Sequence, residues 1–282
     1  MITARWVSGS RERVEPADGT ADAATVREHA VQAAALEHAA ETAQRTGHVW
    51  YVCYGSNMSL RRLNYYLAGG QPPSGALTYP GCRDKRQPER SLPVTLPGRV
   101  YFALEALAWT GGMAFYDRDG PGETPARAHL LSRSQFSDIL AQEMCFEPGS
   151  DLDLTEVLTH GRVVLGPGHY QALLYLGDLE GCPSFTFTAP WRSSEVELRS
   201  PSATYLRHLA AGLSETYGWS PRRIADYLSS RPGAAGHWSP GELVAVIDEL
   251  PGRPEAAGER NVTRSGEFAL ESTPTTVGAG IG

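Results

Sequence analysis

The segment from Trp50 to Met58 constrains the fold of this chain more than any other. Its first residues, Trp-Tyr-Val-Cys, are large and β-prone, as in a strand that enters a hydrophobic core. Gly55 breaks the strand, Ser56 and Asn57 are of the types that cap helix N-termini, and leucines at i, i+3 and i+7 follow from Leu60. A strand, a tight glycine turn and a helix are therefore predicted. Backbone N–H groups then point at one place, where an anion, or a carbonyl oxygen that gains charge, is stabilised.

Composition limits the classes of protein to which the chain can belong. Its 282 residues, 41% hydrophobic and 20% charged, suit one globular domain with or without tails. A formal net charge of -7 argues against electrostatic binding of nucleic acid. The sequence has no apolar run near the ~20 residues that a membrane span needs, and it has no secretory signal pattern. We therefore expect a cytoplasmic protein that does not bind membranes.

Cysteine and histidine spacing offers no metal or redox motif. The four cysteines lie far apart with no C-x-x-C pair: Cys53, Cys82, Cys145 and Cys182. The eight histidines are scattered, without obvious Ser-His or Cys-His spacing. The sequence therefore predicts no metal site and reduced thiols.

Three parts are predicted along the chain. Residues 1–47 comprise a polar arm and an alanine-rich helix from about 21 to 46. The apolar face of that helix is weak and suits either the domain or a partner chain, so a homodimer remains open. Residues 48–250 form the folded domain. Residues 251–282 are rich in Gly, Thr, Ser and charge, and we expect them to form a disordered tail.

Strands and helices are both expected within the domain. Residue patterns predict strands at 76–79, 99–104, 109–116, 126–131, 162–165, 170–176 and 184–189. Helices are predicted at 132–144, 202–216, 221–228 and 240–249, the first with a capping box formed by Ser132 and Gln135. Residues 83–97 are charged and proline-rich, which predicts a long surface loop that either carries specificity or is merely solvated.

Glu143 is the candidate for acid–base chemistry. It lies near the end of the helix at 132–144, beside Ile139, Leu140 and Met144. Both the helix dipole and an apolar environment disfavour the ionised carboxylate there, and its pKa would rise towards the range that a general base needs near neutral pH. The alternative is a surface glutamate that merely ends the helix.

The tetrad Tyr54-Gly55-Ser56-Asn57 resembles the substrate-binding loop of the gamma-glutamylcyclotransferase-like family. Three later segments resemble family features in the same order: the Gly-Gly-Met-Ala strand at 111–114, the helix that ends at Glu143, and the helix at 202–206 with Tyr205. The likeness covers residues 49–228. Met144 departs from the glycine that often follows the family's glutamate.

The resemblance implies an α+β fold, with a mixed β-barrel-like sheet and surrounding helices. It also implies a cofactor-independent enzyme that converts a γ-glutamyl amide, or a related γ-glutamylated amine, to 5-oxoproline and a free amine. The α-amine of the substrate attacks, and Glu143 serves as general acid and base. The substrate-binding residues that the resemblance implies are Tyr54, Gly55, Ser56, Asn57, Met58, Gly112 and Tyr205.

Two other functional classes remain open from the sequence. One is an amide hydrolase, or an acyl or amine transferase, that has the same fold and acts on a natural-product intermediate. The other is a non-catalytic member that binds a small ligand or docks a partner. In each case the expected ligand is a small amino-acid-derived molecule rather than nucleic acid.

Overall fold

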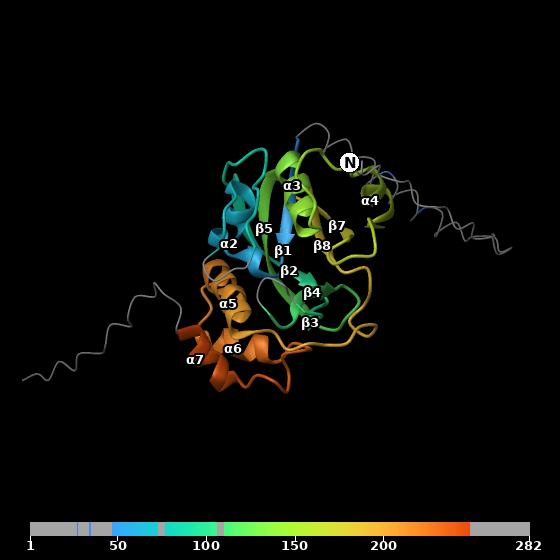
Figure 1. Cartoon of the computed structure of the whole chain (residues 1–282). Helices are drawn as coiled ribbons and strands as arrows, with labels where there is room; N and C mark the ends of the chain where they lie inside the picture. Colours follow the sequence, from blue (N-terminus) through green and yellow to red (C-terminus); the bar gives the residue numbers. More distant parts are fainter. Residues whose placement is uncertain (1–26, 28–33, 35–46, 73–76, 106–109, 249–282) are drawn as a thin grey trace, which may run out of the picture. The chain divides into compact units, whose positions relative to one another are not determined.

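A computed structural model describes residues 27, 34, 47–72, 77–105 and 110–248 of the chain (Figure 1). The two isolated residues, Arg27 and Ala34, are helical. The rest of the predicted N-terminal arm and helix, and the predicted tail at 251–282, lie outside the described residues.

Six strands form one mixed sheet in the order β2-β5-β1-β8-β7-β6. In chain order they are β1 (His48–Cys53), β2 (Arg90–Pro97), β5 (Glu123–Ser132), β6 (Arg162–Val164), β7 (Ala172–Leu179) and β8 (Cys182–Thr188). β1 is parallel to β8, and the other neighbouring strands are antiparallel. The predicted α+β class is confirmed. The sheet is not closed, however, because β2 and β6 are its two edges and do not pair with each other.

β1 is a central strand of this sheet, as its sequence predicts. Five successive residues, from Val49 to Cys53, are buried, so both faces of the strand are covered. This accounts for the continuous run of apolar residues, since a half-exposed strand would alternate between apolar and polar residues. The end of β1 therefore delivers Tyr54 and the glycine turn into the interior of the molecule.

A separate hairpin, β3 (Arg99–Ala103) and β4 (Met113–Asp117), packs beside the end of β8. The Tyr116 backbone N–H donates to Thr188 Oγ1 at 2.9 Å, and the same hydroxyl donates to the Tyr116 carbonyl at 2.8 Å. One threonine side chain thus links the hairpin to the main sheet.

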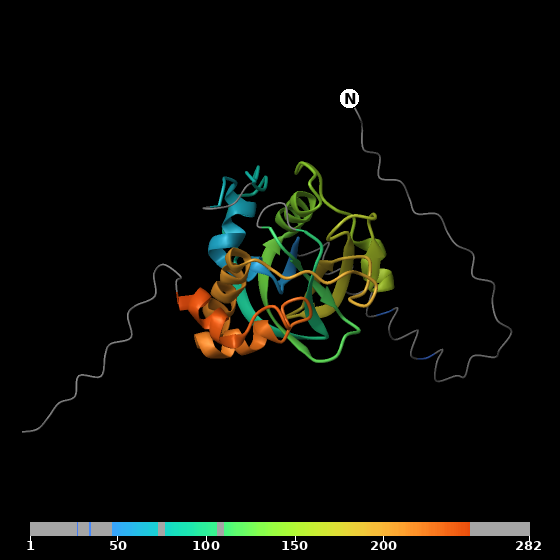
Figure 2. The same ribbon diagram turned by 60° about the horizontal axis from the view of Figure 1, so that its bottom comes forward.

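Seven helical segments are described between residues 47 and 248. They are the 3₁₀ turn η1 (Ser56–Met58), α2 (Leu60–Ala68), α3 (Arg133–Glu143), α4 (Thr155–His160), α5 (Ala203–Tyr217), α6 (Pro221–Ser229) and α7 (Pro240–Asp248). α5, α6 and α7 lie together on one side of the domain, and α3 covers the opposite end of β1 (Figures 1 and 2). The capping box of α3 is confirmed, since Ser132 and Gln135 exchange both of its hydrogen bonds.

Three sequence-based predictions of secondary structure are wrong. The predicted loop at 83–97 contains β2, whose prolines Pro93 and Pro97 are tolerated because an edge strand needs only one row of ladder donors. In the predicted strand at 76–79, the described residues show only an isolated bridge from Tyr79 to Gly70. α4 lies between the predicted helix at 132–144 and the predicted strand at 162–165, where the acidic sequence predicts a loop.

The helix after β1 begins later than the sequence predicts, and a distant residue explains why. Ser56 and Asn57 form η1 and do not cap α2, which begins at Leu60. Glu215 of α5 accepts hydrogen bonds from the Ser59 hydroxyl at 2.7 Å and from the Leu60 N–H at 3.1 Å. A carboxylate from another helix therefore supplies the cap and favours the positive end of α2.

Replacing Glu215 with alanine should lower stability by about 1 kcal/mol, the usual effect of losing an N-terminal cap. The corresponding change in melting temperature is about 2–4 °C for a domain of this size. Thermal unfolding followed by circular dichroism measures it, with Glu147→Ala, at an exposed position, as the matched control. Equal melting temperatures for the two variants would contradict the capping role.

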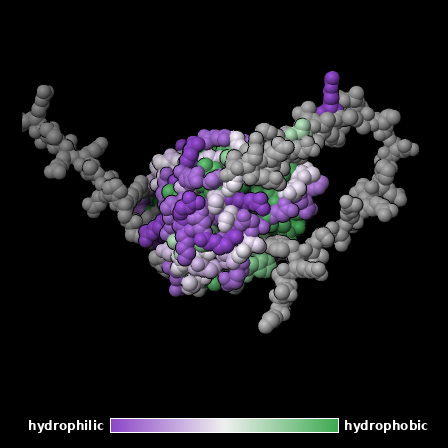
Figure 3. All heavy atoms as spheres, turned by 90° about the horizontal axis from the view of Figure 1, so that it is seen from above, coloured by the Kyte–Doolittle hydropathy of each residue, from purple (hydrophilic) through white to green (hydrophobic). Residues whose placement is uncertain are grey.

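Among the described helices, none is both long enough and apolar enough to cross a bilayer. The face in Figure 3 is mainly hydrophilic over the described residues.

Candidate active site

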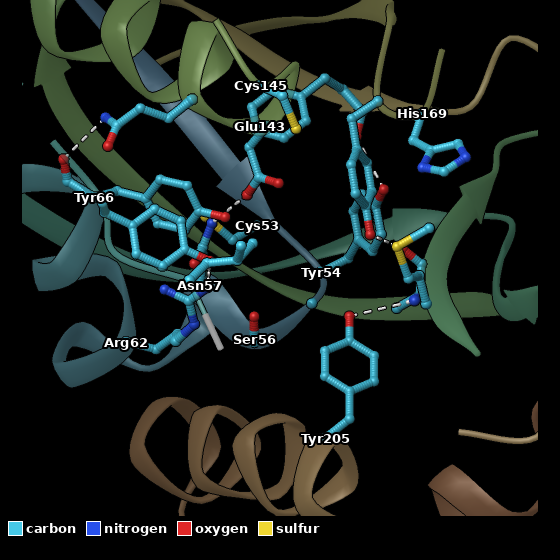
Figure 4. A pocket seen from close by; sticks show the side chains of 18 of the residues that line it. Cys53, Tyr54, Ser56, Asn57, Arg62, Tyr66, Glu143, Cys145, His169 and Tyr205 are labelled. Carbon is cyan, nitrogen blue, oxygen red and sulfur yellow. Dashed lines mark hydrogen bonds between the residues drawn. The ribbon is translucent and has the colours of Figure 1, made fainter. Parts of the chain in front are cut away.

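A cavity of about 190 Å³ lies where β1, α2, the end of α3, β4 and α5 converge (Figure 4). Glu143 lines this cavity. Five of the seven predicted substrate-binding residues line it too: Tyr54, Gly55, Ser56, Asn57 and Tyr205. These residues come from three regions of the chain. The structure thus brings most of the predicted site into one cavity.

Glu143 is the last residue of α3, and its carboxyl group faces the turn after β1 (Figure 4). Asn57 Nδ2 donates to Glu143 Oε1 at 3.1 Å. Removal from water raises the pKa of the Glu143 carboxyl, and this effect outweighs the opposing effects of Tyr66, Arg62 and Asn57. The half-buried Glu143 thus has the raised pKa that the sequence suggested for a partly desolvated glutamate, and its carboxyl binds a proton more tightly than that of a surface glutamate does.

Arg62 is a buried cation in the same cavity. Its guanidinium lies 4.8 Å from the ring centroids of both Tyr66 and Tyr79, and its Nη2 donates to the Tyr79 hydroxyl at 2.6 Å. The two rings hold the charge in a fixed place by cation–π contact. Arg62 and Tyr66 are one turn apart on α2, and this i, i+4 pair beside the leucine face was the sequence signal that could have identified them.

In the loop from Gly55 to Asn57, the first two carbonyl groups accept hydrogen bonds from the residues that follow the loop. Gly55 O accepts from the Met58 N–H at 3.1 Å, and Ser56 O accepts from the Ser59 N–H at 3.2 Å. The N–H groups of Gly55, Ser56 and Asn57 donate to no other group in the described part of the chain. The three residues line the cavity, so three successive amides without a hydrogen-bond acceptor among the described residues lie beside it. The loop precedes α2, and Glu215 already interacts with the N-terminus of that helix. The helix dipole therefore contributes less to anion binding at the loop than the sequence predicts.

The side chain of Asn57 is oriented by its neighbours. Its Nδ2 donates to Tyr51 Oη at 3.2 Å as well as to Glu143. Its Oδ1 is buried and accepts no hydrogen bond from any described residue. An acceptor in this position suits an ammonium or amide N–H of a ligand, because an unsatisfied buried acceptor is costly.

Tyrosines form the opposite wall. The Tyr205 hydroxyl accepts from the Ala114 N–H at 3.2 Å, the Tyr170 hydroxyl donates to Ala114 O at 2.9 Å, and the Tyr54 hydroxyl donates to Phe187 O at 2.9 Å. Burial raises the pKa of Tyr205 to about 12, so its phenol stays neutral. These hydroxyls anchor β4 and β8 around the cavity.

Two predicted binding residues do not line the cavity. Met58 is buried against α5, where a Cβ on Gly212 would lie 2.5 Å from Met58 Cβ. Gly112 packs against the backbone of Arg199, and Met113 and Ala114 line the cavity in its place. The pair Gly111-Gly112 beside a strand predicts either a β-bulge or a close backbone approach, and the structure shows the close approach, to the backbone of residues 199–202. The further lining residues that sequence reasoning missed include Tyr51, Cys53, Gln142, Cys145, His169 and Tyr170.

No group of three His, Cys, Asp or Glu side chains among the described residues is arranged to hold a metal ion.

Comparison with known proteins gives one curated relative. No protein-family model matches the chain. Histone deacetylase 5 of Arabidopsis thaliana is 27% identical over 237 residues, which cover 78% of this chain and 35% of that protein. The chain therefore spans about a third of the length of this relative.

Solved structures similar to this chain include one gamma-glutamyl cyclotransferase and two proteins whose function is not named. A gamma-glutamyl cyclotransferase is 12% identical, with 72% of this chain and 99% of that chain covered and a TM-score of 0.39. The uncharacterized human protein LOC79017 is 16% identical with the same coverage and TM-score, and YkqA of Bacillus subtilis is 18% identical, with 66% and 55% covered and a TM-score of 0.37. All three TM-scores are below 0.5.

Proposed function

We propose that the chain is a cofactor-independent cyclotransferase that converts a γ-glutamyl amide to 5-oxoproline and a free amine. One observation supports this above all: Glu143, a carboxyl with a raised pKa, lies in the same cavity as the three available amides of the Gly55–Asn57 loop. The first supplies proton transfer and the second supplies anion binding. Acyl transfer by a nucleophile within the substrate needs both.

The reaction begins with binding of the substrate's α-ammonium group near Glu143. Asn57 Oδ1 is the buried acceptor for one of its N–H groups. The ionised Glu143 carboxylate takes a proton from the ammonium and leaves a neutral amine with a free electron pair. The raised pKa of Glu143 favours this transfer, because it narrows the gap between the donor and acceptor pKa values.

The amine then attacks the γ-carbonyl carbon, and a five-membered ring forms through a tetrahedral intermediate. Amides of the Gly55–Asn57 loop stabilise the oxygen that carries the negative charge. Glu143, now protonated, donates its proton to the leaving nitrogen as the C–N bond breaks. The Glu143 carboxylate then takes the second proton from the ring nitrogen, which becomes the neutral lactam N–H, and passes it to the released amine, which leaves as an ammonium ion. Carbon, nitrogen and proton are balanced without water, and the intramolecular step gains a high effective molarity.

The product formed in heavy-oxygen water is the decisive test of this function. A γ-glutamyl amide should yield 5-oxoproline without solvent oxygen, as detected by mass spectrometry. The same amide with its α-nitrogen acetylated should be inert, because its lone pair is delocalised and cannot attack. Labelled free glutamate as the main product would contradict cyclisation and would identify an amide hydrolase instead.

A further inference from the structure

His129 of β5 joins the candidate site to an interior polar contact. It is fully buried. Its ring Nε2 lies 3.1 Å from Asn57 O, and its Nδ1 lies 2.8 Å from Ser91 Oγ. Within the sheet, His129 is paired with Tyr51 of β1 on one side and with Ser91 of β2 on the other. The imidazole therefore bridges the edge strand and the loop that lines the cavity.

The partners of His129 fix its tautomer. A carbonyl oxygen can only accept, so the proton of the neutral ring lies on Nε2 and is donated to Asn57 O. Nδ1 is then an acceptor, and the Ser91 hydroxyl donates to it. Burial and the charge of Arg127 lower the pKa of His129 to about 3, against a smaller opposing effect of Asn57 O. The ring therefore stays neutral at physiological pH.

Asn57 connects this interior contact to Glu143. Its carbonyl accepts from His129, and its side-chain Nδ2 donates to Glu143 Oε1. Tyr51 Oη, opposite His129 in the sheet, is the second acceptor of Nδ2. The backbone and the side chain of Asn57 are thus held from two directions by β5 and β1.

We propose that His129 is a positioning residue: its Nε2–H holds the Asn57 carbonyl, and so sets the orientation of the Asn57 amide against Glu143. The kinetic consequences of this assignment rest on the proposed cyclotransferase function. The geometric consequence, a change at the Glu143 carboxyl, does not depend on turnover.

Loss of the Nε2 donor should change Glu143 in a defined direction. The hydrogen bond from Asn57 stabilises the ionised carboxylate and lowers its pKa. If the Asn57 carbonyl is released and the side chain turns away, the pKa of Glu143 rises. Arg62 and Tyr66, which also face the carboxyl, are unaffected by the substitution. The acidic limb of kcat/KM should therefore move to higher pH.

Two polar substitutions separate positioning from simple support of the fold. His129→Gln places an amide N–H where Nε2–H lies, whereas the shorter side chain in His129→Asn reaches only the Nδ1 position. We expect His129→Gln to keep kcat within about threefold. His129→Asn should lose about 10–100-fold in kcat with little change in KM, the order of effect that small misplacement of a reacting group produces. Equal kcat values for the two variants would overturn the assignment.

Ser91→Ala is the matched control. It removes the outer hydrogen bond of the ring but leaves Nε2–H on Asn57 O. Stability should fall, because Nδ1 is left as an unsatisfied buried acceptor, but kcat and the pH profile should be those of the wild type. A loss of kcat in Ser91→Ala as large as in His129→Asn would show that general support of the fold explains both.

Two NMR measurements test the assignment without turnover, and the first of them needs no variant. Nitrogen spectra of the histidine-labelled wild-type protein should show neutral His129 protonated on Nε2, and protonation on Nδ1 would overturn the assignment. A carboxyl titration should show a higher Glu143 pKa in His129→Asn than in His129→Gln. If these results hold while no γ-glutamyl amide is consumed, the proposed function fails and the positioning role stands.

Discussion

Glu143→Gln should lower kcat by about 10²–10⁴-fold, the usual contribution of a group that transfers protons in the transition state. Gln is close in shape to Glu and can still accept a hydrogen bond from Asn57 through its carbonyl oxygen. It can neither take a proton from the substrate ammonium nor return one to the leaving nitrogen. The effect should fall on kcat more than on KM, since the proton is transferred after binding. Steady-state kinetics on a γ-glutamyl amide measures it.

A pH-dependent stability difference shows whether the Glu143→Gln protein is folded as expected. The pKa of Glu143 in the folded state is raised above 4.5, so the folded protein binds this proton more tightly than the unfolded chain does. The wild type therefore loses stability as pH rises from 4.5 through the raised pKa. Gln does not ionise, so the free energy of unfolding of Glu143→Gln does not fall in this way. The variant should therefore be more stable than the wild type at neutral pH but not below pH 4. Glu147→Gln, at an exposed position, is the control that should match the wild type in both respects. Wild-type turnover by Glu143→Gln would leave Glu143 as a residue that merely ends α3.

The local part of the site could be predicted from the sequence. The strand and turn at 48–55 follow from a continuous apolar run and a glycine, both of which act through nearest neighbours along the chain. The capping box of α3 also lies within four residues, and it fixes the start of the helix that ends at Glu143. The tetrad at 54–57 and Glu143 were therefore identified together with the strand and the helix that carry them.

The parts that could not be predicted depend on residues far apart in the chain. α2 begins at Leu60 because Glu215, on a helix distant in sequence, accepts hydrogen bonds from the Leu60 N–H and from the Ser59 hydroxyl. His129 was noted only as part of a strand, since the partners that define its tautomer lie on two other segments. β2 was mistaken for a loop because its prolines are acceptable only at a sheet edge, and no local pattern reveals which strand is an edge.

Gly112 shows how a correct local prediction can have a different functional meaning. A glycine pair beside a strand is typical of a β-bulge or of a close backbone approach, and the family resemblance implied substrate contact. The approach exists, but the neighbour is backbone: the Gly112 N–H donates to Ser200 O at 2.8 Å, and Gly111 forms a bridge with Pro201. These contacts hold β4 against the segment that precedes α5. They place Ala114 on the cavity wall, where its N–H donates a hydrogen bond to the Tyr205 hydroxyl.

Gly112→Ala should therefore destabilise the fold more than an ordinary surface substitution does. A Cβ at this position would lie 2.1 Å from Arg199 O, 2.9 Å from Arg199 C and 3.1 Å from Phe102 Cβ. The closest neighbours are backbone atoms, which cannot move away as the end of a side chain can, so β4 and the 199–201 segment must separate. Forcing extra volume into a packed region costs about 1–3 kcal/mol, and we expect the upper end of that range here. The fall in melting temperature should be about 6–12 °C.

The design of this experiment isolates the steric effect. Gly112 does not have a positive φ angle, so alanine brings no backbone strain of its own. Gly149 also lacks a positive φ angle, and a Cβ there would meet nothing within 4 Å, so Gly149→Ala should leave the melting temperature nearly unchanged. The Gly112→Ala protein that remains folded should also show a raised KM, because displacement of Ala114 moves its contact with Tyr205. If Gly112→Ala melts within 2 °C of Gly149→Ala, β4 does not pack on the 199–201 backbone as closely as the structure shows, and the cavity wall that it forms must be placed differently.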